Sequence, residues 1–99
     1  MCEFKIIKKN DGSQIMEDIV ILSYTENNEL VCRDVLGMGE VLESSLIVDV
    51  NTINQTCVVL DHPIVKDFLN LIQKLSEHTA TPSQVENIQS KLEEIKKSL

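Results

Sequence analysis

The sequence predicts an α+β fold, in which a small antiparallel β-barrel of about five strands is followed by two C-terminal α-helices. Two observations carry this prediction. Up to about Asp61 the apolar residues come in short β-branched runs broken by turn signals, as in small all-β domains. After Asp61 they follow helical spacing, and the boundary falls near His62-Pro63. We therefore expect a barrel domain over residues 1–61 and a helical hairpin over residues 62–99.

Short apolar segments define the strands. In the first segment the side chains alternate between two faces, with Cys2, Phe4 and Ile6 on one face. Residues 10–13 then form a turn that reverses the chain, because Gly and Asn tolerate positive φ. The predicted strands are residues 2–9, 14–24, 30–36, 40–50 and 56–60, with a kink in the fourth at Ser44-Ser45. An open sheet would leave unpaired edges, so we expect these strands to close into a barrel.

The first helix is signalled by Pro63, which suits the first turn of a helix and follows Asp61 or His62 as the N-cap. A broad apolar face should pack on the barrel. It consists of Ile64, Val65, Phe68, Leu69, Ile72 and Leu75.

The second helix begins at a capping box, Thr81-Pro82-Ser83-Gln84, and runs to the C-terminus. Its apolar residues step by three and four, as in a coiled coil. They are Val85, Ile88, Leu92, Ile95 and Leu99. Such a short stripe is not stable alone in water, so it packs either on the first helix, near Phe68, Leu71 and Leu75, or on a partner chain. The sequence leaves both arrangements open.

The charge balance bears on partners and location. Nine basic against sixteen acidic residues give −7, and residues 1–60 alone hold four basic and ten acidic side chains, a balance of −6. Nucleic-acid binding is disfavoured, because one arginine and three lysines among ten acids neutralise few phosphates, and only three aromatic residues are present for base stacking. No apolar run approaches the ~20 residues of a membrane span, and no signal-peptide pattern is present. We expect a cytoplasmic protein with reduced thiols.

The three cysteines divide into two groups. Cys32 and Cys57 fall inside apolar strands and are expected to be core thiols. Cys2 lies beside the terminal amine. If Met1 is removed, the Cys2 thiolate and its own amine form one chelate ring; if Met1 stays, its amine and the Cys2 amide nitrogen do similar work. Two such ends across a dimer supply two sulfurs and two nitrogens, a set that suits Ni(II) or Cu(II) better than Zn(II). The plain alternative is that Cys2 is a small apolar residue starting a core strand.

Catalytic equipment is sparse. His62 lies beside the helix cap and His78 in a polar loop, and neither has a ligand partner at helical spacing. Glu17 and Asp18 can face Asp34 across neighbouring strands, but adjacent acids in a strand point to opposite faces, so they do not make a catalytic pair by themselves. No nucleophile elbow or phosphate loop is present. We expect no enzymatic activity.

The N-terminal region resembles the CooT-like family of small prokaryotic proteins. The resemblance rests on Met1-Cys2-Glu3 before a strand, an Asp-Gly turn, residues 16–20 (MEDIV) and residues 33–37 (RDVLG), and it covers roughly residues 1–60. It implies an SH3-like small barrel, a homodimer, and nickel bound at the second-position cysteine in connection with nickel delivery to carbon monoxide dehydrogenase. Only Cys2 carries over as a functional residue. Residues 61–99 depart from the family pattern and put the simple dimer of the short members in doubt.

Three functions therefore stand as hypotheses. The first is a Ni(II)-binding accessory protein or metallochaperone that holds the metal at Cys2 and Met1 of a homodimer and serves a nickel-enzyme client. The second is an RNA-binding small barrel, since many family members carry that label; it requires Lys5, Lys8, Lys9 and Arg33 to cluster. The third is a protein-interaction module that uses the C-terminal helices and no metal.

Overall fold

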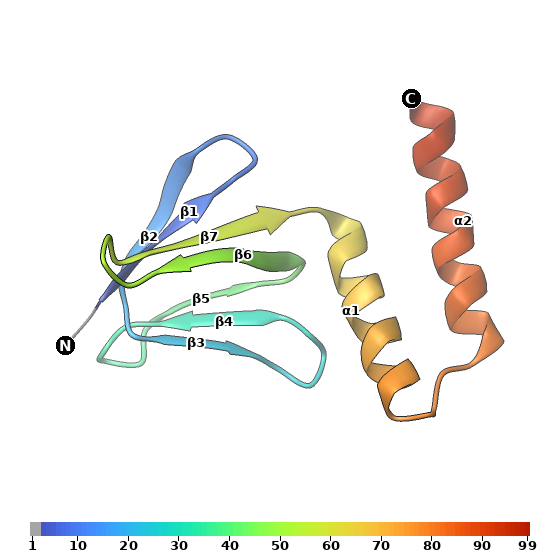
Figure 1. Ribbon diagram of the computed structural model, residues 1–99, viewed down its shortest axis with the longest axis horizontal. Helices are drawn as coiled ribbons and strands as arrows, with labels where there is room; N and C mark the ends of the chain where they lie inside the picture. The colour runs from blue at the N-terminus through green and yellow to red at the C-terminus, as the bar shows by residue number, and fades with distance from the viewer. Residues whose placement is uncertain (1–2) are drawn as a thin grey trace.

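The structure is a computed structural model that describes residues 3–99 and contains seven strands in two sheets, followed by two helices (Figure 1). The α+β class and the two C-terminal helices are confirmed. The strands are β1 (Phe4–Lys8), β2 (Ser13–Ile19), β3 (Ile21–Tyr24), β4 (Leu30–Arg33), β5 (Gly39–Leu42), β6 (Ser45–Asn51) and β7 (Thr56–Asp61). The helices are α1 (Pro63–Ser76) and α2 (Pro82–Ser98).

One sheet has the strand order β2-β1-β7-β6 and the other has the order β3-β4-β5. The pairs are antiparallel except β1 with β7, which is parallel and places Lys5 opposite Thr56. The prediction of a wholly antiparallel arrangement is therefore wrong at this pair. The chain connects β1 to β7 through the intervening strands β2 to β6 rather than through a tight turn. No hairpin therefore forces β1 and β7 to run in opposite directions.

Two predicted strands each divide between the sheets, and this raises the predicted five to seven. Residues 14–24 break at Val20, whose N–H donates to the carbonyl of Arg33 at 2.9 Å, and Asp18 just before the break has a φ of 59°. Residues 40–50 break at Glu43 and Ser44, which confirms the predicted kink to within one residue. Each bend lets one continuous segment serve both sheets.

The core lies between the two sheets. Its buried residues come from β1, β2, β4 and β7, and they are Ile6, Ile19, Leu30, Cys32, Cys57 and Val59. Tyr24 joins the sheets at one edge, because its hydroxyl donates to the carbonyl of Ser45 at 2.7 Å and accepts from the N–H of Ile47 at 3.1 Å. Both backbone groups belong to β6, so the hydroxyl of β3 completes the hydrogen bonding of a strand in the opposite sheet.

Both predicted helix starts are confirmed in detail. His62 is the N-cap of α1, since its Nδ1 accepts from the N–H of Ile64 at 3.1 Å, and Pro63 follows at the first helical position. In α2 the side-chain oxygen of Gln84 accepts from the N–H of Thr81 at 2.8 Å, as a capping box requires.

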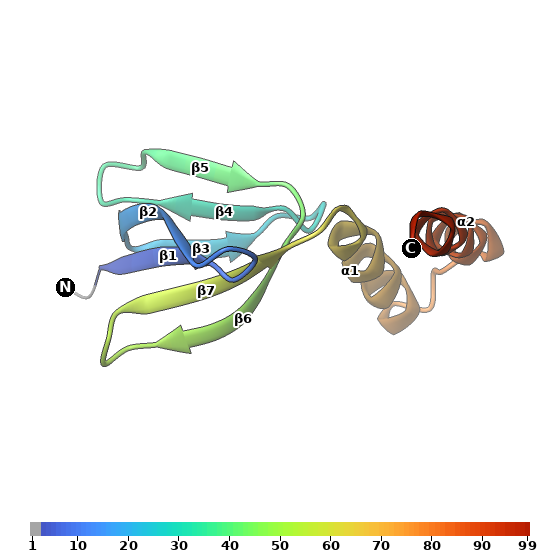
Figure 2. The same ribbon diagram turned by 90° about the horizontal axis from the view of Figure 1, so that it is seen from above.

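The helices stand beyond one end of the sheets, with α1 between the sheets and α2 (Figures 1 and 2). Polar contacts fix α1 to the β3–β4 turn: Lys66 pairs with Glu29 at 3.0 Å, and Asn28 donates to Asn70 at 2.6 Å. The sequence predicted that the apolar face of α1 packs on the barrel. Every residue of α1 keeps some exposure, so the sheets do not fully cover this face. Within residues 3–99, neither helix has the length and apolar character needed to cross a membrane.

Candidate functional site

Cys2 and Met1, the predicted metal ligands, lie outside the described residues, so the structure bears on them through the strand that follows. Lys5 near the start of β1 pairs with Thr56 at the start of β7, whereas the end of β7 leads directly into α1. Strand β7 spans six residues, about 17 Å from its first residue to its last. The start of β1 therefore lies at the end of the sheets remote from the helices (Figure 1).

Two loops flank the start of β1 in both ribbon views (Figures 1 and 2). They are the β4–β5 loop, residues 34–38, and the β6–β7 turn, residues 52–55. We call these loops, together with residues 3 and 4, the N-terminal pole. The sequence predicted a strand as far as Leu36, but β4 ends at Arg33, which places Val35 and Leu36 in the loop instead.

An acidic or amide side chain holds each loop in shape. Asp34 Oδ1 accepts from the N–H groups of Leu36 at 2.9 Å and Met38 at 3.0 Å. Asn51 Oδ1 accepts from the N–H groups of Ile53 and Asn54, both at 3.0 Å. These side chains replace strand pairing for backbone groups that would otherwise lack partners, so both loops have a defined conformation.

The loops present apolar side chains to solvent. Leu36 is 81% exposed and Ile53 is 92% exposed, and Val35 and Met38 are exposed as well. Apolar side chains gathered on ordered loops are typical of a surface that contacts another molecule. The sequence did not predict this surface, although Val35 and Leu36 beside a Gly-Met-Gly turn indicate an apolar run that continues past the strand.

The other two thiols are not available for ligation. Cys32 and Cys57 are fully buried in the core, which confirms the sequence prediction. Burial raises the pKa of the Cys32 thiol to about 11 and also raises the pKa of the Cys57 thiol. Because the thiolate is the metal ligand and the nucleophile, neither residue provides that chemistry near neutral pH. Residues 3–99 hold no group of three or more His, Cys, Asp or Glu side chains arranged to bind a metal ion.

The other polar residues that the sequence singled out lie in loops or on the surface or pair with a neighbouring side chain. Asp34 caps its loop, while Glu17 and Asp18 are exposed. His78 is exposed in the turn between the helices with a φ of 58°. Lys8 lies 3.7 Å from Asp61.

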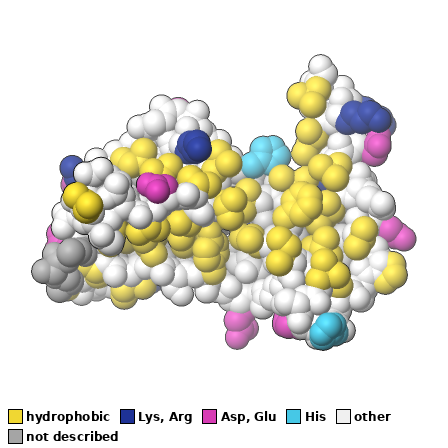
Figure 3. All heavy atoms as spheres, viewed as in Figure 1, with side chains coloured by type: hydrophobic (Ala, Val, Ile, Leu, Met, Phe, Trp, Pro, Cys, Tyr) yellow, Lys and Arg dark blue, Asp and Glu magenta, His cyan; other side chains and the backbone are white. Residues whose placement is uncertain are grey.

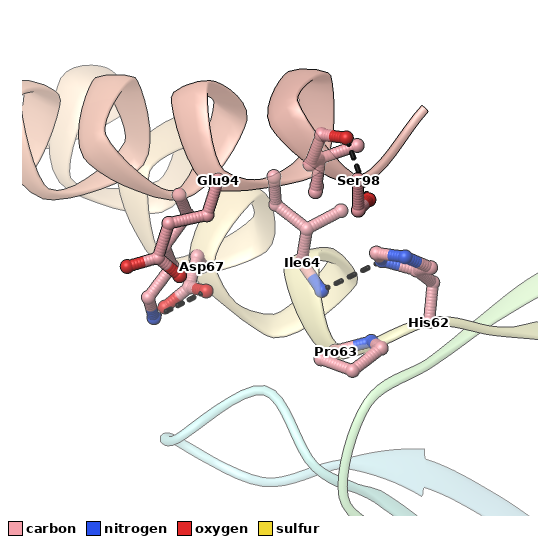
Figure 4. Close-up of a pocket in the computed structure, with 8 residues that line it drawn as sticks. His62, Pro63, Ile64, Asp67, Glu94 and Ser98 are labelled. Atoms are coloured by element: carbon pink, nitrogen blue, oxygen red, sulfur yellow. Dashed lines mark hydrogen bonds and ion pairs between the residues drawn. The ribbon is translucent and has the colours of Figure 1, made fainter.

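A groove of about 420 Å³ lies between the start of α1 and the end of α2 (Figure 4). Its walls include His62 and Ile64 from one side and Glu94 and Ser98 from the other. An ion pair between Asp67 and Lys91, 2.8 Å long, crosses from helix to helix at its inner end. The separate sequence patterns of the two helices did not predict this groove.

No protein-family model matches the chain, and no curated protein matches it as a relative. The family resemblance noted in the sequence therefore enters the functional assignment only as a proposal.

Proposed function

We propose that this protein is a Ni(II)-binding accessory protein, a metallochaperone rather than an enzyme, that holds the metal at Cys2 and Met1 of a homodimer. Carbon monoxide dehydrogenase or another nickel enzyme is the proposed client, and the cytoplasm is the proposed location. The observation that carries the proposal is the position of β1, the strand that follows Cys2. The start of β1 lies between two ordered loops with exposed apolar side chains, at the end of the sheets remote from the helices. We also propose that the two sheets form an SH3-like barrel, as the family resemblance implies.

The distribution of thiols supports this assignment. Of the three cysteines, Cys32 and Cys57 are core residues with raised pKa values, which leaves Cys2 as the candidate sulfur ligand. Sulfur and nitrogen donors from two chain ends make a planar set that suits Ni(II). Such a set needs two copies to meet near the start of β1, and the apolar loops there give a surface for that contact.

A titration of the reduced, tag-free protein with Ni(II) tests the proposal. Sulfur-to-nickel charge-transfer absorption should saturate at one ion per two chains, and Cys2→Ser should abolish it. Cys57→Ser is the matched control, because it removes a thiol that the core keeps from the metal. Binding of equal affinity in Cys2→Ser would refute the nickel site.

RNA binding is the weaker alternative. It needs free, clustered basic side chains, yet Lys8 lies beside Asp61 and the Arg33 guanidinium donates to the carbonyl of Gly37 at 3.3 Å. The surrounding acidity repels phosphate. Retention of a labelled single-stranded RNA at low salt, with affinity falling steeply as salt rises, would favour this function over the metal site.

A further inference from the structure

The apolar stripe of α2 is divided into two columns with different exposures. Ile88 is 5% exposed, and both Ile88 and Ile95 line hollows between α1 and α2. Val85 and Leu92, which belong to the alternate positions of the same stripe, are 40% and 45% exposed, and Leu99 is more exposed still. The first column therefore packs on α1 while the second is left uncovered. In a coiled coil both columns are covered.

Helix α1 repeats this division. Ile64 and Leu71, seven residues apart, line the hollows next to α2. Phe68 and Leu75, also seven apart, are exposed together with Ile72. Figure 3 shows hydrophobic side chains gathered over the helical region on one face of the molecule. We call the exposed residues of the two helices the helical face: Phe68, Ile72, Leu75, Val85 and Leu92.

The molecule exposes more surface than a compact chain of its mass. Its accessible surface is 6735 Å², whereas a compact monomer of 11.2 kDa exposes about 5,700 Å². Its radius of gyration is 15.5 Å, against about 13 Å for a compact domain of this length. The excess, on the order of 1,000 Å², is close to the ~800 Å² that each partner buries in a standard protein interface.

The charge distribution points to a second copy as the occupant. Residues 61–99 hold five basic and six acidic side chains, a balance of −1, while residues 1–60 have a balance of −6. Two copies of so acidic a chain repel each other least where their helices meet. The ion pair between Asp67 and Lys91 is satisfied within one chain, so it leaves no unpaired charge for the partner to neutralise.

We propose that a second copy of this chain covers the helical face with its own α1 and α2, so that two helical hairpins form a four-helix bundle. The contact is isologous: the same residues face each other across a two-fold axis. Each uncovered column then packs against helices of the other copy, as in bundles with coiled-coil packing. This inference does not rest on the proposed nickel site, because β1, the strand that follows Cys2, starts at the opposite end of the molecule.

Sedimentation equilibrium in EDTA, at chain concentrations from about 1 to about 100 μM, tests the proposal. The expected mass is twice the chain mass of 11.2 kDa. Leu92→Lys should weaken the dimer at least ~100-fold, because it places two lysines in an apolar interface. Ser90→Lys adds the same charge on the opposite, solvated side of α2 and should leave the dimer unchanged. Far-UV circular dichroism checks that each variant is folded.

Two further variants separate this contact from the proposed metal site. Cys2→Ser removes the proposed sulfur ligand and Leu36→Lys alters the N-terminal pole, and both should leave the metal-free dimer intact. A monomeric wild-type chain over the whole concentration range would overturn the proposal. So would a dimer that survives Leu92→Lys but dissociates in Leu36→Lys, since that result would place the interface at the N-terminal pole.

Discussion

At the scale of single residues, position determines what each cysteine can do. Cys32 and Cys57 have the same side chain as Cys2, yet the core desolvates them and stabilises the protonated thiol over the thiolate. A buried thiol is therefore a packing residue that resists ionisation, and its raised pKa predicts that stability depends on pH.

We predict that the protein loses stability as the pH rises from 9 toward 11. Burial raises the pKa of Cys32 from 9.0 to about 11, so in this window the folded state binds more protons than the unfolded state. The free energy of unfolding then falls with rising pH, by on the order of 1 to 2 kcal/mol across the window. Urea unfolding of the wild type and Cys32→Ala, at several pH values, should show a smaller pH slope in the variant. Identical slopes would contradict this account.

At the scale of elements, the pairing of β4 with β5 depends on a glycine. Gly39 lies opposite Arg33 with a φ of 152°, and a Cβ built there would overlap the carbonyl oxygen of Cys32. Gly12 has a φ of 75° in the β1–β2 turn but has open space around it. A side chain at Gly12 would meet backbone strain alone, whereas a side chain at Gly39 would meet both backbone strain and a steric clash.

We predict that Gly39→Ala destabilises the protein by more than about 3 kcal/mol, because both strain and the clash with backbone act there. Gly12→Ala serves as its control and should cost about 1 kcal/mol from strain alone. Urea unfolding of both variants measures the difference. Equal losses would show that β5 moves aside to accept the methyl group.

At the scale of the whole molecule, two surfaces occupy opposite ends. The N-terminal pole carries exposed apolar loops around the start of β1, and the helical face lies beyond the far end of the sheets (Figure 1). If the two chains of a dimer joined through the helical face point their N-terminal poles in opposite directions, the two poles stay apart. Bringing two Cys2 thiolates together then requires a second, separate contact between dimers.

We predict that Ni(II) raises the mass of the assembly above that of the dimer. Two different isologous contacts on one chain join dimers into larger assemblies. Light scattering during a Ni(II) titration should show this increase, and it should be absent in Cys2→Ser. In Leu92→Lys, the same titration should stop at a dimer joined through the metal. Cys2-dependent binding with no change of mass in the wild type would show that the thiols meet within one dimer.

Local patterns determined much of the fold. The turn at residues 10–13, the kink near Ser44, the cap at His62 and the capping box at Thr81 all follow from residues within a few positions of one another. Burial of Cys32 and Cys57 followed from their apolar neighbours. The metal site at Cys2 lies outside the described residues and stays a prediction.

By itself the sequence determined the class of the fold, the places where the two helices begin, and the identity of the core thiols, because these depend on near neighbours in the chain. The tertiary structure alone decided that β1 pairs in parallel with β7, that two strands divide between sheets, and that one apolar column on each helix is left uncovered. The first of these features joins residues about 50 positions apart, and the others depend on how whole elements pack, so no local pattern encodes them.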